Sequence, residues 1–180
     1  MRILLTGASS FSGLWFARML AEAGHSVVAA NRSSAYEEPL RQTRVERVAQ
    51  YAELIPDAPF GGDAFLKLIA VRGPFDVLCH HGAEAAGHKR PDFDVDGAVR
   101  ANTWRMDETL AAFKAAGGVR LVITGSVFEH EEGWGEEPRR AFSPYGMSKT
   151  LTSQAFMEGA GRAGLEAVKF VIPNPFGPYE

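Results

Sequence analysis

Tyr145 and Lys149 are four residues apart in the segment Ser-Pro-Tyr-Gly-Met-Ser-Lys. Residues at this spacing lie on the same face of a helix. An ammonium group beside a phenol stabilises the phenolate, so the pair predicts a tyrosine that exchanges a proton near neutral pH. Lowering a tyrosine pKa from about 10 to about 7 requires about 4 kcal/mol of preferential stabilisation of the phenolate. The same spacing fits a surface helix with a half-buried tyrosine and a solvated lysine, so the surrounding sequence must decide.

The elements around this pair alternate between strands and helices. Ser143 can cap the helix that carries the pair, and Pro144 suits its first turn. Strands are expected at residues 3–5, 26–30, 44–48, 75–79, 120–124 and 165–172. Helices are expected at residues 14–23, 63–71, 95–116 and 144–161, with a short helix or loop at 37–41. Nearly continuous apolar strands that alternate with helices predict an α/β fold: a doubly wound (Rossmann-type) parallel sheet with helices on both faces.

In such a sheet, ligands bind beyond the carboxyl ends of the strands. Segments with chemically useful residues follow five of the expected strands, at 6–13, 31–34, 80–84, 124–126 and 173–177. We therefore expect one site at this edge of the sheet.

The segment 6–13, Thr-Gly-Ala-Ser-Ser-Phe-Ser-Gly, follows the first strand and opens the first helix. Glycines there allow a sharp turn and let a pyrophosphate approach the N–H groups of the helix N-terminus. Ser10 stands where the middle glycine of this pattern is usual, and its hydroxyl could add a phosphate contact. The residues expected to bind a dinucleotide here are Gly7, Ser9, Ser10, Phe11 and Gly13. The alternative is an ordinary glycine-containing turn, and no Gly-Lys-Ser/Thr supports an ATP-type loop.

The end of the second strand discriminates between the two nicotinamide dinucleotides. An acidic residue at this place binds the ribose hydroxyls of NAD. This chain has Asn31, Arg32 and Ser33 instead, and a guanidinium group suits a 2′-phosphate. The sequence therefore favours NADP over NAD, although Arg32 could also be a solvated loop residue.

The composition excludes several classes of function. The chain has 180 residues, enough for one domain with a substantial core, and a formal net charge of -3 does not predict a nucleic-acid surface. The single Cys79 excludes an internal disulfide, and the five histidines show no zinc-ligand spacing, so no metal site is expected. No apolar run is long enough to span a membrane and no signal peptide is evident, so the cytoplasm is the expected location.

These motifs together resemble the extended short-chain dehydrogenase/reductase family, in its sugar-nucleotide epimerase/dehydratase branch, over essentially the whole chain. The stretch 143–149 is close to that family's most recognisable motif. Residues 76–83, Asp-Val-Leu-Cys-His-His-Gly-Ala, resemble its Asp-x-Val-x-His-Leu-Ala-Ala segment. Residues 122–129 resemble its strand that ends in Val-Tyr-Gly, and residues 174–178 resemble its Asn-Val-Tyr-Gly-Pro segment.

The resemblance implies a mechanism and a set of site residues. Tyr145 takes the proton from a substrate hydroxyl while a hydride moves from that carbon to the nicotinamide, and reduction is the reverse. Thr124, with Ser126 as the fallback, hydrogen-bonds the substrate oxygen, and Lys149 binds the nicotinamide ribose and favours the tyrosinate. Further cofactor-binding positions implied by the resemblance are His80, Gly82, Ala83, Asn102 and Pro173, and implied substrate-binding positions are Ser126 and Asn174. Asn102 is also expected to support the active-site loop.

Departures from the family pattern narrow the reaction. The sugar dehydratases have an acidic pair after the catalytic threonine, where this chain has Gly125 and Ser126, so an epimerase or a reductase is preferred. Glu129 replaces a usual glycine and, with the acidic loop that follows, could shape the substrate mouth or be solvated, and the solvated alternative is favoured. His80, His81 and His88 are expected to pack in the interior or to line the cofactor site.

The expected domains are a dinucleotide-binding domain, residues 1–172, and the beginning of a substrate-binding portion, residues 173–180, which continues in family members. We therefore expect dinucleotide binding, poor turnover of a nucleotide-sugar-like substrate, an exposed apolar patch and a possible homodimer through helices 95–116 and 144–161. The alternative is an NADP-binding sensor or interaction module without turnover. An S-adenosylmethionine methyltransferase is disfavoured because the second strand does not end in an acid. The sequence does not specify the sugar or the direction of reaction.

Overall fold

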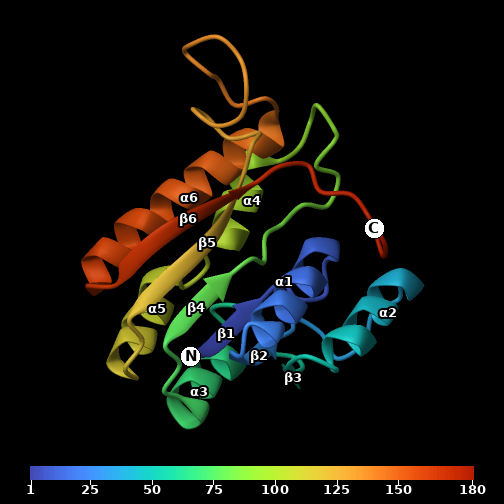
Figure 1. Cartoon of the computed structure of the whole chain (residues 1–180). Helices are drawn as coiled ribbons and strands as arrows, with labels where there is room; N and C mark the ends of the chain where they lie inside the picture. The colour runs from blue at the N-terminus through green and yellow to red at the C-terminus, as the bar shows by residue number, and fades with distance from the viewer.

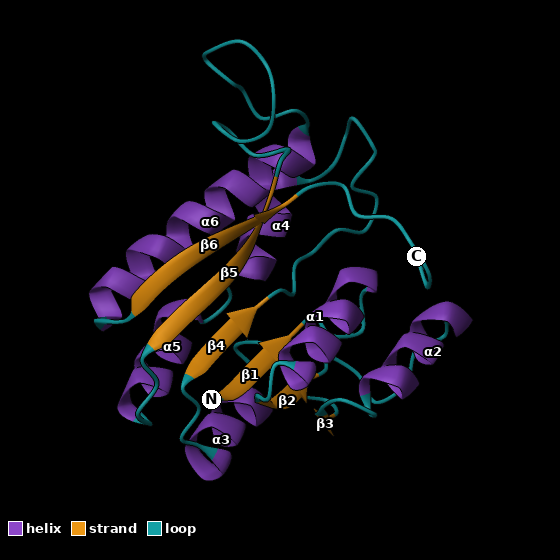
Figure 2. Cartoon of the chain, in the orientation of Figure 1, coloured by secondary structure: helices purple, strands orange, loops and turns teal.

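A computed structural model describes residues 1–180 and has a parallel sheet between two layers of helices (Figures 1 and 2). The strands are β1 (Arg2–Thr6), β2 (Ser26–Ala30), β3 (Glu53–Ile55), β4 (Val77–His80), β5 (Arg120–Ser126) and β6 (Glu166–Ile172). The helices are α1 (Phe11–Glu22), α2 (Pro39–Val48), α3 (Asp63–Arg72), α4 (Val95–Asn102), α5 (Met106–Ala115) and α6 (Pro144–Ala163). None of the helices combines length and apolarity in the way that a membrane span requires.

The sheet has six strands in the order β3-β2-β1-β4-β5-β6, and all its pairs are parallel. The order reverses at β1, which pairs with both β2 and β4. This is the doubly wound sheet that the strand–helix alternation predicts. The ends of β1 and β4 therefore form the topological switch point, where ligands bind in such folds.

Each face of the sheet has its own apolar core. The larger cluster has 17 buried residues and joins the sheet to α3, α5 and α6, with Phe65, Phe113 and Phe156 among its fully buried side chains. The smaller cluster has 7 buried residues and joins the other face to α1 and α2. Burial on both faces explains why the central strands read as continuous apolar runs.

The region 37–48 differs from its prediction. The expected strand at 44–48 is wrong, because residues 39–48 form helix α2 and the third strand is β3. Pro39 begins the helix, and Arg44, Val45 and Val48 are buried along one side of it. The spacing between Arg44 and Val48 is one helical turn, so the burial follows a helical period.

The expected long helix at 95–116 is two helices. Arg105 adopts a left-handed conformation (φ 49°) between α4 and α5 and interrupts the helical hydrogen bonds. Its guanidinium is held by ion pairs to Glu108 and Asp63, which belong to α5 and α3. Both of its partners are exposed carboxylates, so these ion pairs accompany the break and do not by themselves account for it.

β6 is an edge strand with one exposed apolar face. Val168 is 49% exposed and Phe170 is 53% exposed, although the ring of Phe170 lies 6.0 Å from that of Phe16 on α1. The predicted exposed apolar patch corresponds to this face. After β6 the chain crosses toward α2, where Arg44 donates a hydrogen bond to the carbonyl oxygen of Tyr179 at 2.6 Å.

Candidate active site

The loop between β1 and α1 is closed by its own serine. Ser10 Oγ accepts a hydrogen bond from Gly13 N at 3.0 Å and donates one to Gly7 O at 2.9 Å, and it lies 3.1 Å from His81 Nε2. These contacts keep the hydroxyl within the loop and at His81, so the phosphate contact expected of it would require these hydrogen bonds to rearrange. The N–H groups of Phe11 and Ser12, in the first turn of α1, lack helical partners and remain available to an anion.

Gly7 allows two loops to approach closely. Its φ of 74° is left-handed, and a Cβ atom at this position would lie 2.6 Å from Gly82 N. Thr6 Oγ1 accepts a hydrogen bond from the same Gly82 N at 3.1 Å. The loop after β1 and the loop after β4 are therefore packed backbone to backbone at the switch point.

Two adjacent histidines support this junction. His80 Nδ1 lies 3.0 Å from Thr6 Oγ1, and its ring packs against Phe60 and Phe156. His81 Nε2 lies 2.9 Å from Ser12 Oγ as well as near Ser10. Burial lowers the pKa of His80 to about 3 and that of His81 to about 4, so both rings are neutral at neutral pH. The contacts of His81 with the serines had no signal in the sequence, because they join residues about 70 positions apart.

A cavity of about 680 Å³ opens along the carboxyl ends of β1, β2 and β4. The predicted cofactor residues that line it are Gly7, Ser9, Ser10, Phe11, Asn31, Arg32, His80, Gly82, Ala83 and Asn102. The predicted cofactor residues outside its lining are Gly13, Ser33, Lys149 and Pro173. Sequence reasoning missed the lining residues Tyr36, Arg41, Arg44, Phe60, Glu84 and Trp104.

The end of the cavity near β2 is rich in arginine. Arg41 donates a hydrogen bond from Nε to Ser9 Oγ at 3.2 Å, and its guanidinium lies 5.0 Å from the ring centroid of Tyr36. Arg32 extends into solvent, 3.7 Å from Glu84. The hydroxyl of Ser33, by contrast, donates a hydrogen bond to Ala35 O at 2.7 Å within a local turn.

These features fit a dinucleotide. Asn31 is buried at the end of β2, and its Oδ1 has no hydrogen-bond partner although it lies at the cavity. A buried acceptor without a partner is costly, and a ribose hydroxyl would satisfy it. The free N–H groups of α1 suit a pyrophosphate, and the close approach at Gly7 leaves the backbone uncovered by side chains.

The catalytic candidates come from α6 and β5. Ser143 caps α6 by accepting a hydrogen bond from Gly146 N at 3.1 Å, and Pro144 is in the first turn, as the sequence predicts. Lys149 is 8% exposed and donates a hydrogen bond from Nζ to the backbone oxygen of Thr124 at 2.7 Å. Burial lowers the pKa of Lys149, while the charge of Glu129 opposes that change.

Tyr145 stands one turn before Lys149 and packs against His88 and Phe93, with ring centroids 5.5 and 5.8 Å away. His88 lines the cavity, so the phenol lies beside the cavity but outside its lining. Burial, and then the negative charge of Glu129, raise the pKa of Tyr145. The prediction of a lowered pKa is therefore wrong for this state of the protein, because burial and the charge of Glu129 both disfavour the phenolate.

Asn102, at the end of α4, connects the cavity to α6. Its Oδ1 accepts a hydrogen bond from Glu84 N at 2.7 Å, and its Nδ2 donates to Thr152 Oγ1 at 3.3 Å. The side chain thus holds the loop after β4, in line with the support expected of it.

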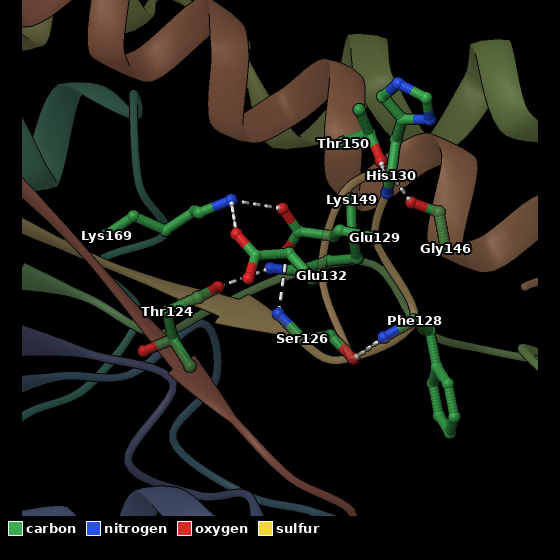
Figure 3. Close-up of polar contacts among 10 residues, drawn as sticks. All are labelled: Thr124, Ser126, Phe128, Glu129, His130, Glu132, Gly146, Lys149, Thr150 and Lys169. Carbon is green, nitrogen blue, oxygen red and sulfur yellow. Dashed lines mark hydrogen bonds and ion pairs between the residues drawn. The ribbon is translucent and has the colours of Figure 1, made fainter. Parts of the chain in front are cut away.

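The turn after β5 contains the largest departure from expectation. Glu129 is 1% exposed, so the prediction that it is solvated is wrong. Its Oε1 accepts a hydrogen bond from Ser126 N at 2.7 Å (Figure 3). Ser126 Oγ accepts one from Phe128 N at 3.2 Å, so this hydroxyl is engaged within the turn. Asn174, the second expected substrate contact, is exposed.

The sequence model of the NAD dependent epimerase/dehydratase family matches residues 3–180 of this chain. The chain belongs to this family. A search of curated proteins finds no match. Because the family model spans nearly the whole chain, the loop after β1 and the Tyr145–Lys149 helix both lie within the matched region.

Solved structures of epimerases and dehydratases share the fold. UDP-glucuronic acid 4-epimerase from Bacillus cereus, in complex with NAD, has 19% sequence identity and a TM-score of 0.76, covering 100% of this chain and 58% of that one. UDP-glucose 4-epimerase from Thermotoga maritima, with UDP-glucose, has 18% identity and a TM-score of 0.71, covering 94% of this chain and 54% of that one. A dTDP-glucose 4,6-dehydratase from Streptomyces venezuelae has 20% identity and a TM-score of 0.73, covering 100% of this chain and 58% of that one. This chain thus spans little more than half the length of these neighbours.

Proposed function

We propose that this family member is an NAD(P)-dependent epimerase or reductase that acts on a nucleotide-sugar-like substrate, with NADP favoured over NAD. The observation that carries the proposal is the hydrogen bond from Lys149 Nζ to Thr124 O. It fastens α6 to the end of β5, so that Tyr145 lies beside His88 at the cavity. The nucleotide sugars named for the structural neighbours support this substrate class.

The proposed roles follow from the geometry. The free N–H groups of α1 and the Oδ1 of Asn31 would hold a dinucleotide, whose bound nicotinamide would supply or accept the hydride. Tyr145 exchanges a proton with the substrate oxygen, which the hydroxyl of Thr124 orients. Since the pKa of Tyr145 is raised, its phenol is protonated at neutral pH and is ready to donate, as reduction requires. Epimerisation begins with proton removal, so it requires the pKa of Tyr145 to fall when substrate and dinucleotide are bound.

The preference for NADP rests on the arginines at the end of β2. Arg32, Arg41 and Arg44 all line the cavity there, and the strand ends in Asn31 with no carboxylate. Guanidinium groups are suited to a phosphate monoester, whereas a ribose diol prefers an acidic partner. Glu84 and Glu38 pair with Arg32 and Arg44, so Arg41 is the arginine of the three with no acidic partner.

A module that binds a dinucleotide without turnover is the second candidate. It is favoured by the position of Thr124, Tyr145 and Lys149 outside the cavity lining. Replacing Tyr145 by Phe separates the two candidates. For an enzyme, the variant keeps NADPH affinity in a calorimetric titration but loses UDP-sugar turnover, which is followed by nicotinamide absorbance for a reductase and by formation of the inverted sugar for an epimerase, and Tyr51→Phe keeps both. Unchanged turnover in Tyr145→Phe would contradict the acid/base role.

A further inference from the structure

The turn after β5 places a carboxylate in the protein interior next to the catalytic candidates. Glu129 is 1% exposed, and glutamate is almost never so buried unless it is paired. None of the roles proposed above uses it. Its burial therefore requires an explanation from its contacts.

The carboxylate is bound from two sides (Figure 3). Its Oε1 accepts from Ser126 N at 2.7 Å, within the turn itself. Its Oε2 lies 3.4 Å from the ammonium of Lys169, which also binds Glu132 at 2.5 Å. Lys169 belongs to β6 and stands opposite Ile123 of β5 in the strand register. Glu129 thereby connects the turn to both strands at their ligand-binding end.

The adjacent backbone leaves space for this carboxylate and continues to α6. A Cβ atom on Gly125 would lie 3.0 Å from Glu129 Oε1 and 3.0 Å from the Lys169 side chain, so glycine leaves this space open. The next residue, His130, donates its N–H to Thr150 Oγ1 at 2.9 Å, and Thr150 donates to Gly146 O at 3.0 Å. The turn is therefore attached to the same two helical turns that carry Tyr145 and Lys149 (Figure 3).

The charge of Glu129 acts on both members of that pair. It contributes, after burial, to the raised pKa of Tyr145, and it opposes the lowering of the Lys149 pKa by burial. The other ionisable groups around Tyr145 are His88, whose ring contacts the phenol ring, and Lys149 on its own helix. Glu132 faces the ammonium of Lys169 and does not contact the pair.

We propose that Glu129 is a positioning residue for Tyr145 and Lys149. Held by Ser126 and Lys169, its carboxylate fixes the turn after β5 and influences the protonation equilibria of these two side chains. A buried ion pair by itself contributes little to stability, so stability alone does not account for Glu129. The inference rests on the proposed function only where it concerns turnover. The effect of the Glu129 charge on Tyr145 can be measured in the protein without ligands.

Titration of Tyr145 in the full chain tests the inference. Protein labelled with ¹³C at tyrosine Cζ gives one resonance for each of the 4 tyrosines, and Tyr145→Phe assigns the relevant one. Glu129→Gln keeps an oxygen that can accept from Ser126 N–H but removes the charge. We expect its Tyr145 midpoint to move to lower pH, whereas Glu132→Gln keeps the wild-type midpoint. Glu129→Asp, which retains the charge, should titrate nearer the wild type than Glu129→Gln does.

A Tyr145 midpoint in Glu129→Gln that is unchanged, or higher than in the wild type, would overturn the inference. If Glu129→Gln does not fold because the Lys169 ammonium loses one of its two carboxylate partners, the double variant Glu129→Gln/Lys169→Gln removes both charges. The same downward movement of the midpoint is expected there, and its absence would overturn the inference equally. Failure of the proposed function is distinguishable, because it would be seen as absent hydride transfer in a wild type whose Tyr145 midpoint still depends on Glu129.

Discussion

The ammonium of Lys149 donates a hydrogen bond to the backbone oxygen of Thr124 at 2.7 Å. This bond joins α6 to β5 near the carboxyl end of the strand. Both groups are buried, so water does not compete for this bond. The contact holds the lysine against the strand. The raised pKa of Tyr145 has separate causes, which are burial and then the charge of Glu129.

Replacing Lys149 by Met should separate chemistry from stability. We expect turnover to fall by about 100-fold or more, since the charge beside the reacting tyrosine is lost. The lost hydrogen bond is offset by no longer burying a charge, so the free energy of unfolding should change by less than about 2 kcal/mol. Urea unfolding and a nicotinamide absorbance assay measure the two effects. Lys114→Met, at an exposed position of α5, should change neither, and equal turnover in the two variants would argue against a role for Lys149.

Gly7 and Gly24 form a matched pair for testing the dinucleotide cradle. Both have a left-handed φ, 74° and 82°, but a Cβ atom on Gly7 would collide with Gly82 whereas Gly24 has nothing within 4 Å. Gly24→Ala should cost about 1–2 kcal/mol of stability from backbone strain alone and keep NADPH binding. Gly7→Ala should cost more and weaken NADPH binding at least about tenfold. Calorimetric titrations that give equal affinities for the two variants would contradict the assigned site.

Arg41→Ala tests the choice of dinucleotide. If the guanidinium of Arg41 contacts the 2′-phosphate, the variant should lose about tenfold in NADPH affinity, or about 1.4 kcal/mol, with little change for NADH. Arg47→Ala is the control, because Arg47 lies on the same helix against Tyr179 and does not line the cavity. A parallel loss of both dinucleotides in Arg41→Ala would mean that this arginine does not select between them.

The buried His80 predicts acid sensitivity. Its pKa is about 3 in the folded protein, through burial and then the charges of Lys149 and His81, and about 6.5 when unfolded. Between these values the unfolded chain binds one more proton, so stability falls as the pH decreases from about 6.5. Removing His80 should reduce that slope by about 1 kcal/mol per pH unit.

The comparison of His80→Asn with His130→Asn, by urea unfolding at pH values from 7 to 4, checks this assignment. His130→Asn is the control, because His130 is exposed and its replacement removes an imidazole outside the core. The two slopes, rather than the absolute stabilities, carry the result, because asparagine also loses the packing of the imidazole on Phe60 and Phe156. Identical slopes in all three proteins would place the acid-sensitive group elsewhere.

Local sequence patterns predicted an element correctly where the contacts of that element alone determine which of its residues are buried. The predicted bounds of the second strand, 26–30, are those of β2, and Ser143 caps α6 as expected. The sequence predicts a polar strand at residues 44–48, whereas these residues belong to helix α2. The prediction treats Arg44 as a polar surface residue, but it is buried on one side of this helix. No local period reports the break at Arg105, whose guanidinium contacts Asp63 more than 40 positions away.

The same distinction holds for the site. The residues of the loop after β1 could be named in advance because they carry a contiguous pattern, and most of them line the cavity. Glu129 could not be placed correctly, because its partner Lys169 is 40 positions away on an edge strand. Without that partner, an acidic residue at the start of an acidic loop is expected to be solvated. Arg41 was missed for a similar reason, since its contact with Ser9 joins α2 to the loop after β1.

The most direct measurement of the central claim follows a hydrogen isotope. A UDP-sugar deuterated at the reacting carbinol carbon is incubated with the protein and NADP⁺ or NAD⁺, and mass spectrometry locates the deuterium. We predict that in the wild type the label either enters the reduced nicotinamide or, for an epimerase, returns to the carbinol carbon of the inverted sugar, and that neither happens in Tyr145→Phe, although both proteins bind the dinucleotide. Dinucleotide binding without any transfer of label in the wild type, or the same transfer in Tyr145→Phe, would contradict the proposed hydride transfer with Tyr145 as acid/base.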